Sequence, residues 1–558
     1  MIPIKKLIPG LTALLVTLAV PGIGNAAITP GSLFTDNAVL QQKIPVPVWG
    51  TADPNEPIVV TINGQTAKTT ADDKGAWTVK LKPIPAGGPY TLTITGTPAD
   101  TVTLNNILVG EVWICGGQSN MQYPVKGFIP GSLTTDAIAK ATDPMIHFVN
   151  VSNTIGITPQ TSVKGNWQEA NPNTVGNLSA VGYFFGRDLR KALGVPIGLI
   201  HDNWGGTPAE AWTSKEALDA VPDLKHYVDE EASYTTRYPK MVEDFDARMV
   251  TYNADKAKFD AAVADAKTNG TPVPTNAPRK PNMPNAYERW PSGAGHLYNG
   301  MIAPIAGYGI KGTIWYQGEA NGGRGWEYKT LLATMITDWR KKWGQGDFPF
   351  LFVQLAPFMS LTPTPLPRNA NGWPDLREAQ RQVSLTLPNT GMAVITDQGD
   401  IRDIHPQRKE PVGVRLALIA RATVYGEKGI EYSGPMFDSL KVEGSTARVK
   451  FTHATGMKAI EIHDVKDDGP LIASAEKVLG FEVAGADQVY YAADAKIDGT
   501  SILVSNPNVT IPVAVRYGWA NYPVANLSNG AGLPATPFKS DNWSWASGPK
   551  DPAPAAAK

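Results

Sequence analysis

Between residues 106 and 435, short apolar runs alternate with helical segments, and this alternation restricts the possible folds more than any other feature of the sequence. Six runs are almost continuously apolar: ILVGEVWICGG, MIHFVNV, VPIGLIHDNWGG, IKGTIWYQGE, FPFLFVQLAP and GMAVITDQGD. Segments with helical patterns lie between them, such as AVGYFFGRDLRKAL and YKTLLATMITDWRKKW. Because strands that are apolar on both faces need cover on both faces, the pattern predicts an α/β fold with a parallel sheet between two helical layers.

Two β-rich regions flank this α/β region. Residues 28–105 and 436–545 contain short runs rich in Val, Ile and Thr, separated by turn sequences such as TADDKG and PAGGP. Runs of this length and spacing predict β-sandwich-like regions at both ends. The last residues, 546–558, include DPAPAAAK and are expected to form a disordered tail.

A helical insertion interrupts the α/β region at about residues 216–290. Apolar residues recur there in steps of three and four, at Val242, Phe245, Met249, Tyr252, Phe259 and Val263, with Lys256 filling the gap between Tyr252 and Phe259. This spacing predicts a long helix or a helix pair packed on the domain. The Pro-rich stretch TPVPTNAPRKPNMP then predicts an extended connector.

The N-terminal segment, residues 1–27, has the pattern of a secretory signal peptide. Lys5 and Lys6 precede an apolar stretch, and GNAA offers small residues for cleavage near Ala26 or Ala27. A transmembrane anchor is the alternative, but prolines and glycines interrupt the apolar stretch. We therefore expect a secreted or periplasmic protein without a membrane anchor after cleavage.

Charge and cysteine content exclude several classes of protein. The formal net charge of the 558 residues is -1, so no basic field suggests binding to nucleic acid. Cys115 is the only cysteine, so no internal disulfide can form and stability must come from the size of the core. The oligomeric state is not encoded in any pattern that we recognise.

The stretch ILVGEVWICGGQSNMQYPV contains a candidate catalytic serine. An apolar strand is followed there by two glycines and, shortly after them, by Ser119. At the carboxyl end of a parallel strand, Ser119 would lie at the edge where α/β folds bind ligands. A serine there can act as a nucleophile if a base removes its proton. The alternative is a serine that caps a helix or forms a turn.

His405 is the favoured base among seven histidines. It follows a buried strand and an acidic loop, in VITDQGDIRDIHPQ, where Asp403 could orient the imidazole. Asp397 and Asp400 are alternative partners for it, and His201 is a rival base because it also ends a strand. A surface histidine that caps the next helix is the non-catalytic alternative.

Two further loops end strands at the same edge. HDNWGGTPAEAW contributes Gly205 and Gly206, whose N–H groups can approach an oxyanion closely, and WYQGEAN contributes Gln317, Glu319 and Asn321. Each loop by itself is ordinary. Four polar, glycine-bearing loops at the ends of buried strands favour an active site.

The motifs GGQSNM, WGGTPAEAW, LYNGMIAPI, IKGTIWYQGEAN and DIHP together resemble the sialate O-acetylesterase family, which belongs to the SGNH-hydrolase superfamily. The resemblance covers about residues 28–540. It implies a flavodoxin-like αβα core within residues 106–435, and carbohydrate O-deacetylation as the activity.

The resemblance also implies roles for individual residues. Ser119 matches the nucleophile, His405 the general base, and the N–H groups of Ser119 and of Gly205 or Gly206 the oxyanion donors. The superfamily's side-chain donor, usually an Asn, falls in QGEAN, where Asn321 is preferred over Gln317 and Glu319; Gln118 is a further possible contact. The superfamily's Asp lies three residues before the His, but Arg402 stands there, so Asp403, two residues before, is the expected third member.

The expected reaction is serine-catalysed removal of O-acetyl groups from a carbohydrate, without metal or other cofactor, since no metal-binding motif occurs. The family points to 9-O-acetylated sialic acids; acetylated plant hemicellulose, such as xylan or xyloglucan, is the alternative substrate. A non-catalytic carbohydrate-binding protein is the alternative of a different class, and a scaffold or adhesion protein is the least favoured one.

Overall fold

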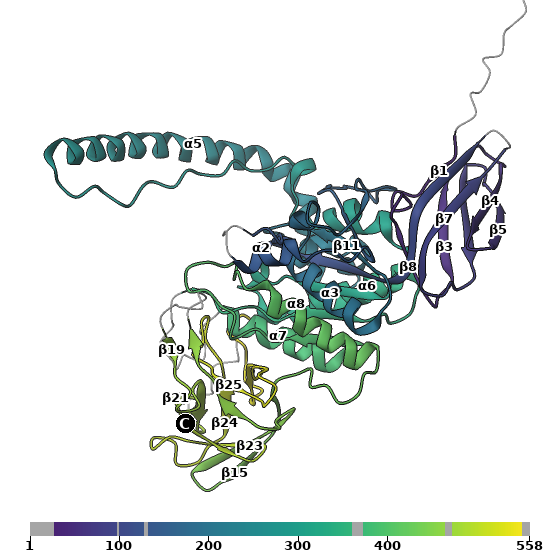
Figure 1. Ribbon diagram of the computed structural model, residues 1–558. Coiled ribbons are helices and arrows are strands. Elements are labelled where there is room, and N and C mark those ends of the chain that lie inside the picture. Colours follow the sequence, from purple (N-terminus) through teal and green to yellow (C-terminus); the bar gives the residue numbers. More distant parts are fainter. Residues whose placement is uncertain (1–26, 98–99, 128–131, 360–371, 464–470, 550–558) are drawn as a thin grey trace, which may run out of the picture.

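A large mixed sheet between helices forms the centre of the molecule in a computed structural model, which describes residues 27–97, 100–127, 132–359, 372–463 and 471–549 (Figure 1). The predicted signal peptide lies outside the described residues except for Ala27. No helix in the described part of the chain is both long and apolar enough to cross a membrane.

The central strands run in the order β10-β9-β11-β8-β12-β13-β14. All neighbours are parallel except β10, which pairs antiparallel with β9 at one edge. Their bounds are β8 (Thr101–Gly117), β9 (Ile146–Asn150), β10 (Trp167–Glu169), β11 (Ile197–Asn203), β12 (Gly312–Tyr316), β13 (Phe350–Val353) and β14 (Thr390–Ala393). The predicted parallel sheet is therefore present, with one antiparallel edge strand added.

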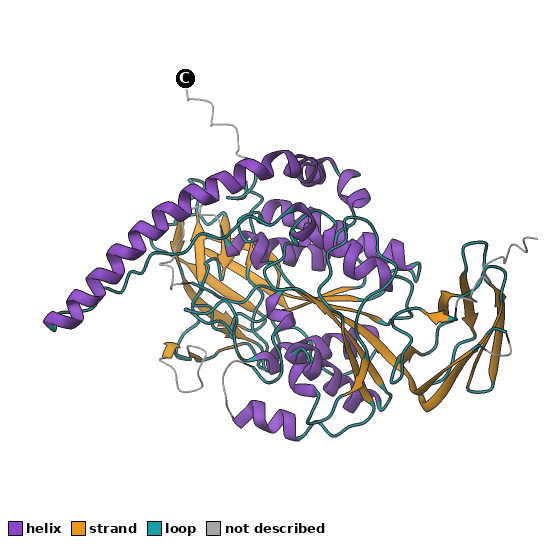
Figure 2. Cartoon of the chain, turned by 90° about the horizontal axis from the view of Figure 1, so that it is seen from above, coloured by secondary structure: helices purple, strands orange, loops and turns teal. Residues whose placement is uncertain are grey.

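Both faces of this sheet are covered, which explains why its strands are apolar throughout. Val112 and Ile114 point into the core cluster that α6 (Gly325–Trp343) and α7 (Trp373–Thr386) cover. Trp113 and Cys115 point into the opposite cluster, under α3 (Ala180–Leu193) and α8 (Lys409–Ile419). Figure 2 shows the two helical layers on either side of the strands.

Strand β8 joins the N-terminal β-region to the central sheet without a break. Its first part pairs with β7, and its last residues, from Glu111 to Gly117, pair with β11. The sequence predicts a domain boundary between residues 105 and 106, but this boundary falls inside β8 and is wrong. Asn106, with φ of 56°, interrupts the regular alternation that would have marked one long strand.

The remaining N-terminal strands form a three-stranded sheet, β1-β3-β6, and an extension of the central sheet through β2, β4, β5 and β7. Their bounds are β1 (Thr29–Pro30), β2 (Val39–Gln41), β3 (Val46–Thr51), β4 (Pro57–Ile62), β5 (Gln65–Thr70), β6 (Ala76–Leu81) and β7 (Gly87–Thr95).

The C-terminal region is built around two four-stranded sheets that share one apolar core. The first sheet contains β15 (Met436–Glu443), β16 (Thr446–Thr452), β23 (Ser501–Ser505) and β22 (Asp494–Asp498). The second contains β21 (Tyr490–Ala492), β20 (Phe481–Ala484), β24 (Ala514–Tyr517) and β26 (Phe538–Lys539). Two-stranded pairs supplement them: β17 (Lys458–Ala459) with β25 (Leu527–Ser528), and β18 (Ile462–His463) with β19 (Leu471–Ala473).

The helical insertion differs from the prediction of a helix packed on the domain. It consists of α4 (Lys215–Asp219) followed by one 45-residue helix, α5 (Lys225–Asn269), which projects away from the rest of the molecule (Figure 1). Tyr227 and Tyr234 near the start of α5 are buried, but the predicted apolar positions from Val242 to Val263 are only half-buried, and Val250 is 71% exposed. The period of the apolar residues correctly predicted a helix. The prediction that the domain covers its apolar side does not hold for the residues from Val242 to Val263.

The end of the described chain is held in place by the α/β region. Ser547 donates hydrogen bonds from its N–H and its Oγ to Oδ2 of Asp375, at 2.8 and 2.6 Å. The sequence predicts a disordered tail from residue 546, which is too early. Residues 550–558 of that tail lie outside the described residues.

Candidate active site

Three neighbouring parallel strands end together, at Gly117, Asn203 and Tyr316. Gly117 has φ of 136°, and a Cβ atom at this position would lie 2.2 Å from the carbonyl oxygen of Tyr316. Only glycine fits this turn, which leads from β8 into the short helix α1 (Ser119–Gln122). The N-cap of α1 is Gln118, without a side-chain capping bond, so Ser119 is not the helix cap considered as an alternative.

The side chain of Ser119 faces His405. The Oγ of Ser119 lies 2.9 Å from Nε2 of His405, and Nδ1 of the same imidazole lies 3.2 Å from Oδ1 of Asp403. The N–H of His405 donates to the same carboxylate oxygen at 2.9 Å. A hydroxyl, an imidazole and a carboxylate thus form a continuous hydrogen-bonded chain, the arrangement that serine hydrolases use to activate a nucleophile.

The other two candidate aspartates have structural partners. Asp397 forms a bidentate ion pair with Arg415, at 2.6 Å for both contacts, and although burial opposes ionisation, Arg415 holds the pKa of Asp397 below its ordinary value. Asp400 accepts hydrogen bonds from the N–H groups of Arg402 and Asp403 and so shapes the loop. Neither carboxylate is bonded to His405.

His201 is not placed to act as the base. It lies inside β11 with Nδ1 hydrogen-bonded to Asn150, and burial lowers the pKa of His201 to about 4. The prediction that left His201 as a rival of His405 is not supported by this geometry.

Gly205 and Gly206 lie beside the nucleophile, as the loop after β11 predicts. A Cβ atom on Gly205 would approach Cβ of Ser119 to 3.3 Å. The N–H of Gly205 donates to Oε1 of Gln122 at 3.1 Å, whereas that of Gly206, whose φ is 76°, has no acceptor among the described residues. Gly206 is therefore the freer of the two backbone donors.

The preferred side-chain oxyanion donor, Asn321, makes hydrogen bonds to other parts of the protein. It is 1% exposed; its Nδ2 donates to Glu210, and its Oδ1 accepts from the N–H of Ala209 and from Gln317. Gln317 is excluded for the same reason, because both N–H groups of its amide are used, by Thr207 and Asn321. Both side chains hold the two loops together rather than face the nucleophile.

Gln118 offers an amide in a different situation. Its Oε1 accepts from the N–H groups of Gly318 and Ala320, at 3.4 and 3.3 Å, which orients the amide. The hydrogen bonds of the Gln118 side chain within the described ranges all go to Oε1, and none is made by its Nε2 group. Glu319, the other candidate, accepts a bond from Asn120 and offers no donor while it is ionised.

Asn120 was not predicted as a site residue, yet it connects three parts of the site. Its Nδ2 donates to Oε1 of Glu319 at 2.6 Å and to the carbonyl of Ile404 at 3.0 Å, and its Oδ1 accepts from Nζ of Lys409 at 2.5 Å. Because Ile404 precedes His405, Asn120 fixes the histidine loop against the helix of Ser119. Its position directly after Ser119 was the only feature of the sequence that could have marked Asn120 as a site residue.

Lys409 and Glu319 are buried charges on either side of Asn120. The ammonium of Lys409 lies over the rings of Tyr123 and Tyr316, at 5.0 and 5.4 Å from their centroids. Burial lowers the pKa of Lys409 to about 7, against the opposing effect of Glu319 and Asp403. Burial also raises the pKa of Glu319. The network is therefore sensitive to proton uptake and loss near neutral pH.

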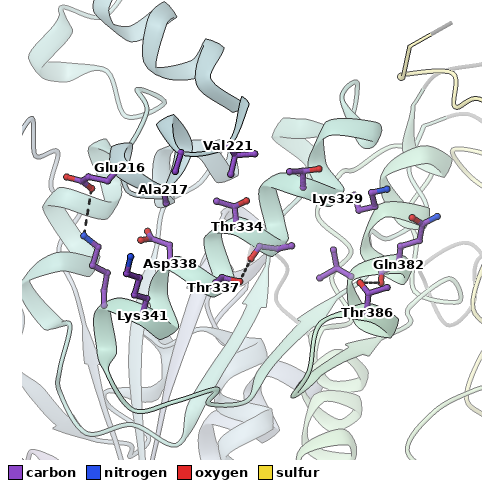
Figure 3. Close-up of a pocket in the computed structure, with 15 residues that line it drawn as sticks. Glu216, Ala217, Val221, Lys329, Thr334, Thr337, Asp338, Lys341, Gln382 and Thr386 are labelled. Carbon is purple, nitrogen blue, oxygen red and sulfur yellow. Dashed lines mark hydrogen bonds and ion pairs between the residues drawn. The ribbon is translucent and has the colours of Figure 1, made fainter. Parts of the chain in front are cut away.

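One large cavity lies away from this site. It measures about 670 Å³ and lies between α4, α6 and α7, lined by alanines, threonines and three lysines (Figure 3). A smaller cavity of about 330 Å³ does adjoin the site, because Gly206 and Ala320 line it. No group of three or more His, Cys, Asp or Glu side chains that could hold a metal ion occurs within the ranges that the structure describes.

An α/β fold with a serine–histidine pair at the carboxyl ends of its parallel strands is typical of a serine hydrolase. Residues 284–412 match the family model described as carbohydrate esterase, sialic acid-specific acetylesterase. A carbohydrate acetylesterase from Xanthomonas citri has a similar solved structure, with a TM-score of 0.73 and 35% identity over 93% of this chain and 100% of that chain. The chain thus belongs to the sialate O-acetylesterase family of carbohydrate esterases and is a carbohydrate O-acetylesterase.

Curated relatives agree with this family over most of their length. The chain is 29% identical to sialate O-acetylesterase of Mus musculus, with 90% of this chain and 93% of the relative aligned. The corresponding protein of Rattus norvegicus is 27% identical, with 90% and 93% aligned. Membership in an enzyme family sets aside the alternative of a non-catalytic carbohydrate-binding protein.

Proposed function

We propose that Ser119, His405 and Asp403 remove O-acetyl groups from a carbohydrate by acyl transfer. His405 takes the proton of Ser119 while Oγ attacks the acetyl carbonyl, and it then returns the proton to the departing sugar alcohol. Water hydrolyses the acetyl-serine with His405 again acting as base. The observation that carries this proposal is the hydrogen-bonded chain from Ser119 through His405 to Asp403.

The developing oxyanion needs donors that face the attacked carbonyl. The N–H groups of Ser119 and Gly206 are available for this, with Gly205 as the alternative once Gln122 moves. The oriented Nε2 of Gln118 supplies the side-chain donor in place of Asn321. Donors of this kind act most strongly where water is excluded.

We assign the core to the flavodoxin-like SGNH type and the flanking regions to β-sandwich-like units. Without the edge pair β9–β10, the strand order is β11-β8-β12-β13-β14, which corresponds to the order 2-1-3-4-5 of flavodoxin-like folds. Ligands bind at the point where such an order reverses, beside β8, and Ser119 follows β8 directly.

The substrate is proposed as an acetylated sugar, either a 9-O-acetylated sialic acid or an acetylated plant hemicellulose. The names of the relatives support the first, and the Xanthomonas enzyme is described more broadly as a carbohydrate acetylesterase. We also propose export from the cytoplasm, on the basis of the signal-like segment at residues 1–27.

Acetate release by the wild type and by Ser119→Ala tests the proposal. The variant should retain only a background of about 10³–10⁴ over the uncatalysed reaction. Ser445→Ala, an exposed change in the turn between β15 and β16, is the matched control and should behave like the wild type. Acetate release by Ser119→Ala at the wild-type rate would show that another residue is the nucleophile.

A further inference from the structure

The cavity of about 330 Å³ lies between four segments that are far apart in the chain. The loop after β11 contributes Gly206 and Glu210, and the loop after β12 contributes Ala320 and Arg324. The first turns of α5 and the segment near Trp290 close the other side. A volume of this size is in the range of small-ligand sites.

The cavity opens directly beside the nucleophile. Gly206 follows Gly205, whose backbone lies against Ser119, and the N–H of Ala320 is bonded to the side chain of Gln118, the residue before Ser119. A sugar whose acetyl group reaches Ser119 would therefore extend into this space.

Aromatic side chains form part of the wall, as in many sugar-binding sites. Trp290 stacks on Tyr234 with ring centroids 4.1 Å apart and an angle of 13°, which holds the indole in place. Tyr227 lines the cavity from α5 and is 5% exposed. Rigid aromatic faces can pack against the apolar face of a sugar ring while polar neighbours bond its hydroxyls.

The charged residues that line the cavity are two glutamates, Glu210 and Glu230, and one arginine, Arg324. Arg324 is the only basic residue that lines it, and its Nη2 donates to Oε1 of Glu210 at 2.9 Å. Its Nη1 bonds the hydroxyl of Tyr227 and lies 3.7 Å from Glu327. Glu230 adds a further carboxylate to the lining, with Arg237 at 3.4 Å on the solvent-exposed surface of α5. The guanidinium of Arg324 is thus already neutralised, and a carboxylate entering the cavity would meet acidic groups.

We propose that this cavity binds the sugar that carries the acetyl group and that it selects a neutral sugar over one with a carboxylate. The substrate class is then an acetylated neutral glycan, such as hemicellulose, rather than a sialic acid. This inference rests on the proposed role of Ser119, because that role places the acetyl group at the mouth of the cavity.

A matched pair of substrates tests the inference: methyl glucoside and methyl glucuronide with the same pattern of monoacetylation. They differ by one carboxylate, so the ratio of their kcat/KM values isolates the charge. We expect the wild type to prefer the glucoside by about tenfold or more, since placing like charges together is costly. Added salt should reduce the preference by screening the exposed carboxylates.

Two variants should weaken the preference. Glu210→Gln frees Arg324 to pair with the glucuronide, so the ratio should fall by about tenfold. Glu230→Gln removes an exposed charge and should lower the ratio about two- to fivefold. Glu243→Gln makes the same change in charge farther along α5, about 20 Å away by helical rise, and should leave the ratio unchanged.

The outcomes separate this inference from the proposed function. Equal or faster hydrolysis of the glucuronide by the wild type overturns the inference, and so does failure to hydrolyse either sugar ester. Hydrolysis of 4-nitrophenyl acetate, which carries no sugar, depends on the catalytic residues and not on the sugar cavity. Its loss in Ser119→Ala upholds the proposed function whatever the sugar ratio shows. Persistence of that activity in Ser119→Ala would contradict the proposed function instead.

Discussion

Ser119 and His405 are 286 positions apart in the sequence, and yet Oγ of Ser119 and Nε2 of His405 are 2.9 Å apart. The carboxyl ends of parallel strands lie at one edge of a sheet, so loops that follow different strands can meet there. Nδ2 of Asn120 donates a hydrogen bond to the carbonyl of Ile404, next to His405, and so holds the two loops together. A contact to the backbone of the histidine loop therefore helps to position Ser119 and His405, in addition to the hydrogen bond between their side chains.

Replacement of His405 by Ala should lower kcat by about 10²–10⁴-fold, the usual contribution of a general base, with a smaller effect on KM. The physical reason is that no other imidazole is bonded to Ser119. Steady-state hydrolysis of 4-nitrophenyl acetate measures both constants. His463→Ala, in the C-terminal strand β18, should match the wild type. A His405→Ala enzyme with unchanged kcat would show that another group activates Ser119.

Replacement of Asp403 by Asn should cost less than the loss of His405. The Asp403 side chain is 50% exposed and its contact with Nδ1 is 3.2 Å, so solvent shares the task of stabilising the imidazolium. We expect roughly a ten- to hundredfold loss of kcat, below the ~10⁴-fold loss known for a buried triad aspartate. The exposed Asp494→Asn is the control. An unchanged kcat in Asp403→Asn would remove this residue from the mechanism.

The role of Gln118 can be separated from its structural bonds by Gln118→Glu. The carboxylate keeps an oxygen for the N–H groups of Gly318 and Ala320 but removes the amide donor. If Nε2 stabilises the oxyanion, kcat should fall about 10²–10³-fold while KM changes little. Gln65→Glu in the N-terminal β-region is the control. Full activity of Gln118→Glu would leave the oxyanion to backbone donors.

The sequence predicted the central sheet well because its apolar runs leave no uncovered face. The same runs located Ser119 and His405, since both follow a buried strand, and the structure brings them together. The boundary at residue 105 failed because Asn106 disrupts the alternation of β8 locally. The packing of α5 was not predicted correctly, because the spacing of apolar residues indicates a helix but does not indicate which residues cover it.

The hydrogen bonds of Asn321 could not be predicted from the sequence. A donor's availability depends on its partners, and those of Asn321 lie at Glu210 and Ala209, more than a hundred residues away in the sequence. Lys409 was missed for a similar reason, because a lysine at the start of a helix is ordinarily exposed. Only the fold brings Tyr123 and Tyr316 around it.

Lys409 should make the stability of the protein depend on pH above neutrality. Burial lowers the pKa of Lys409 from 10.5 to about 7, so between these values the unfolded chain binds a proton that the folded chain does not. The free energy of unfolding therefore rises with pH in this window, and the gain is lost as the pH falls towards 7. Met cannot titrate, so the stability of the wild type relative to Lys409→Met should increase by on the order of 3 kcal/mol from pH 7 to pH 10.

Urea unfolding of both proteins at several pH values measures this difference, and subtraction removes the titration of all other groups. Lys450→Met, an exposed change on β16, should show no such trend. A difference between the wild type and Lys409→Met that stays constant from pH 7 to pH 10 would mean that Lys409 keeps its charge inside the protein. In that case the electrostatic attraction of Glu319 and Asp403 outweighs burial, and Asn120 bridges two full charges beneath the nucleophile.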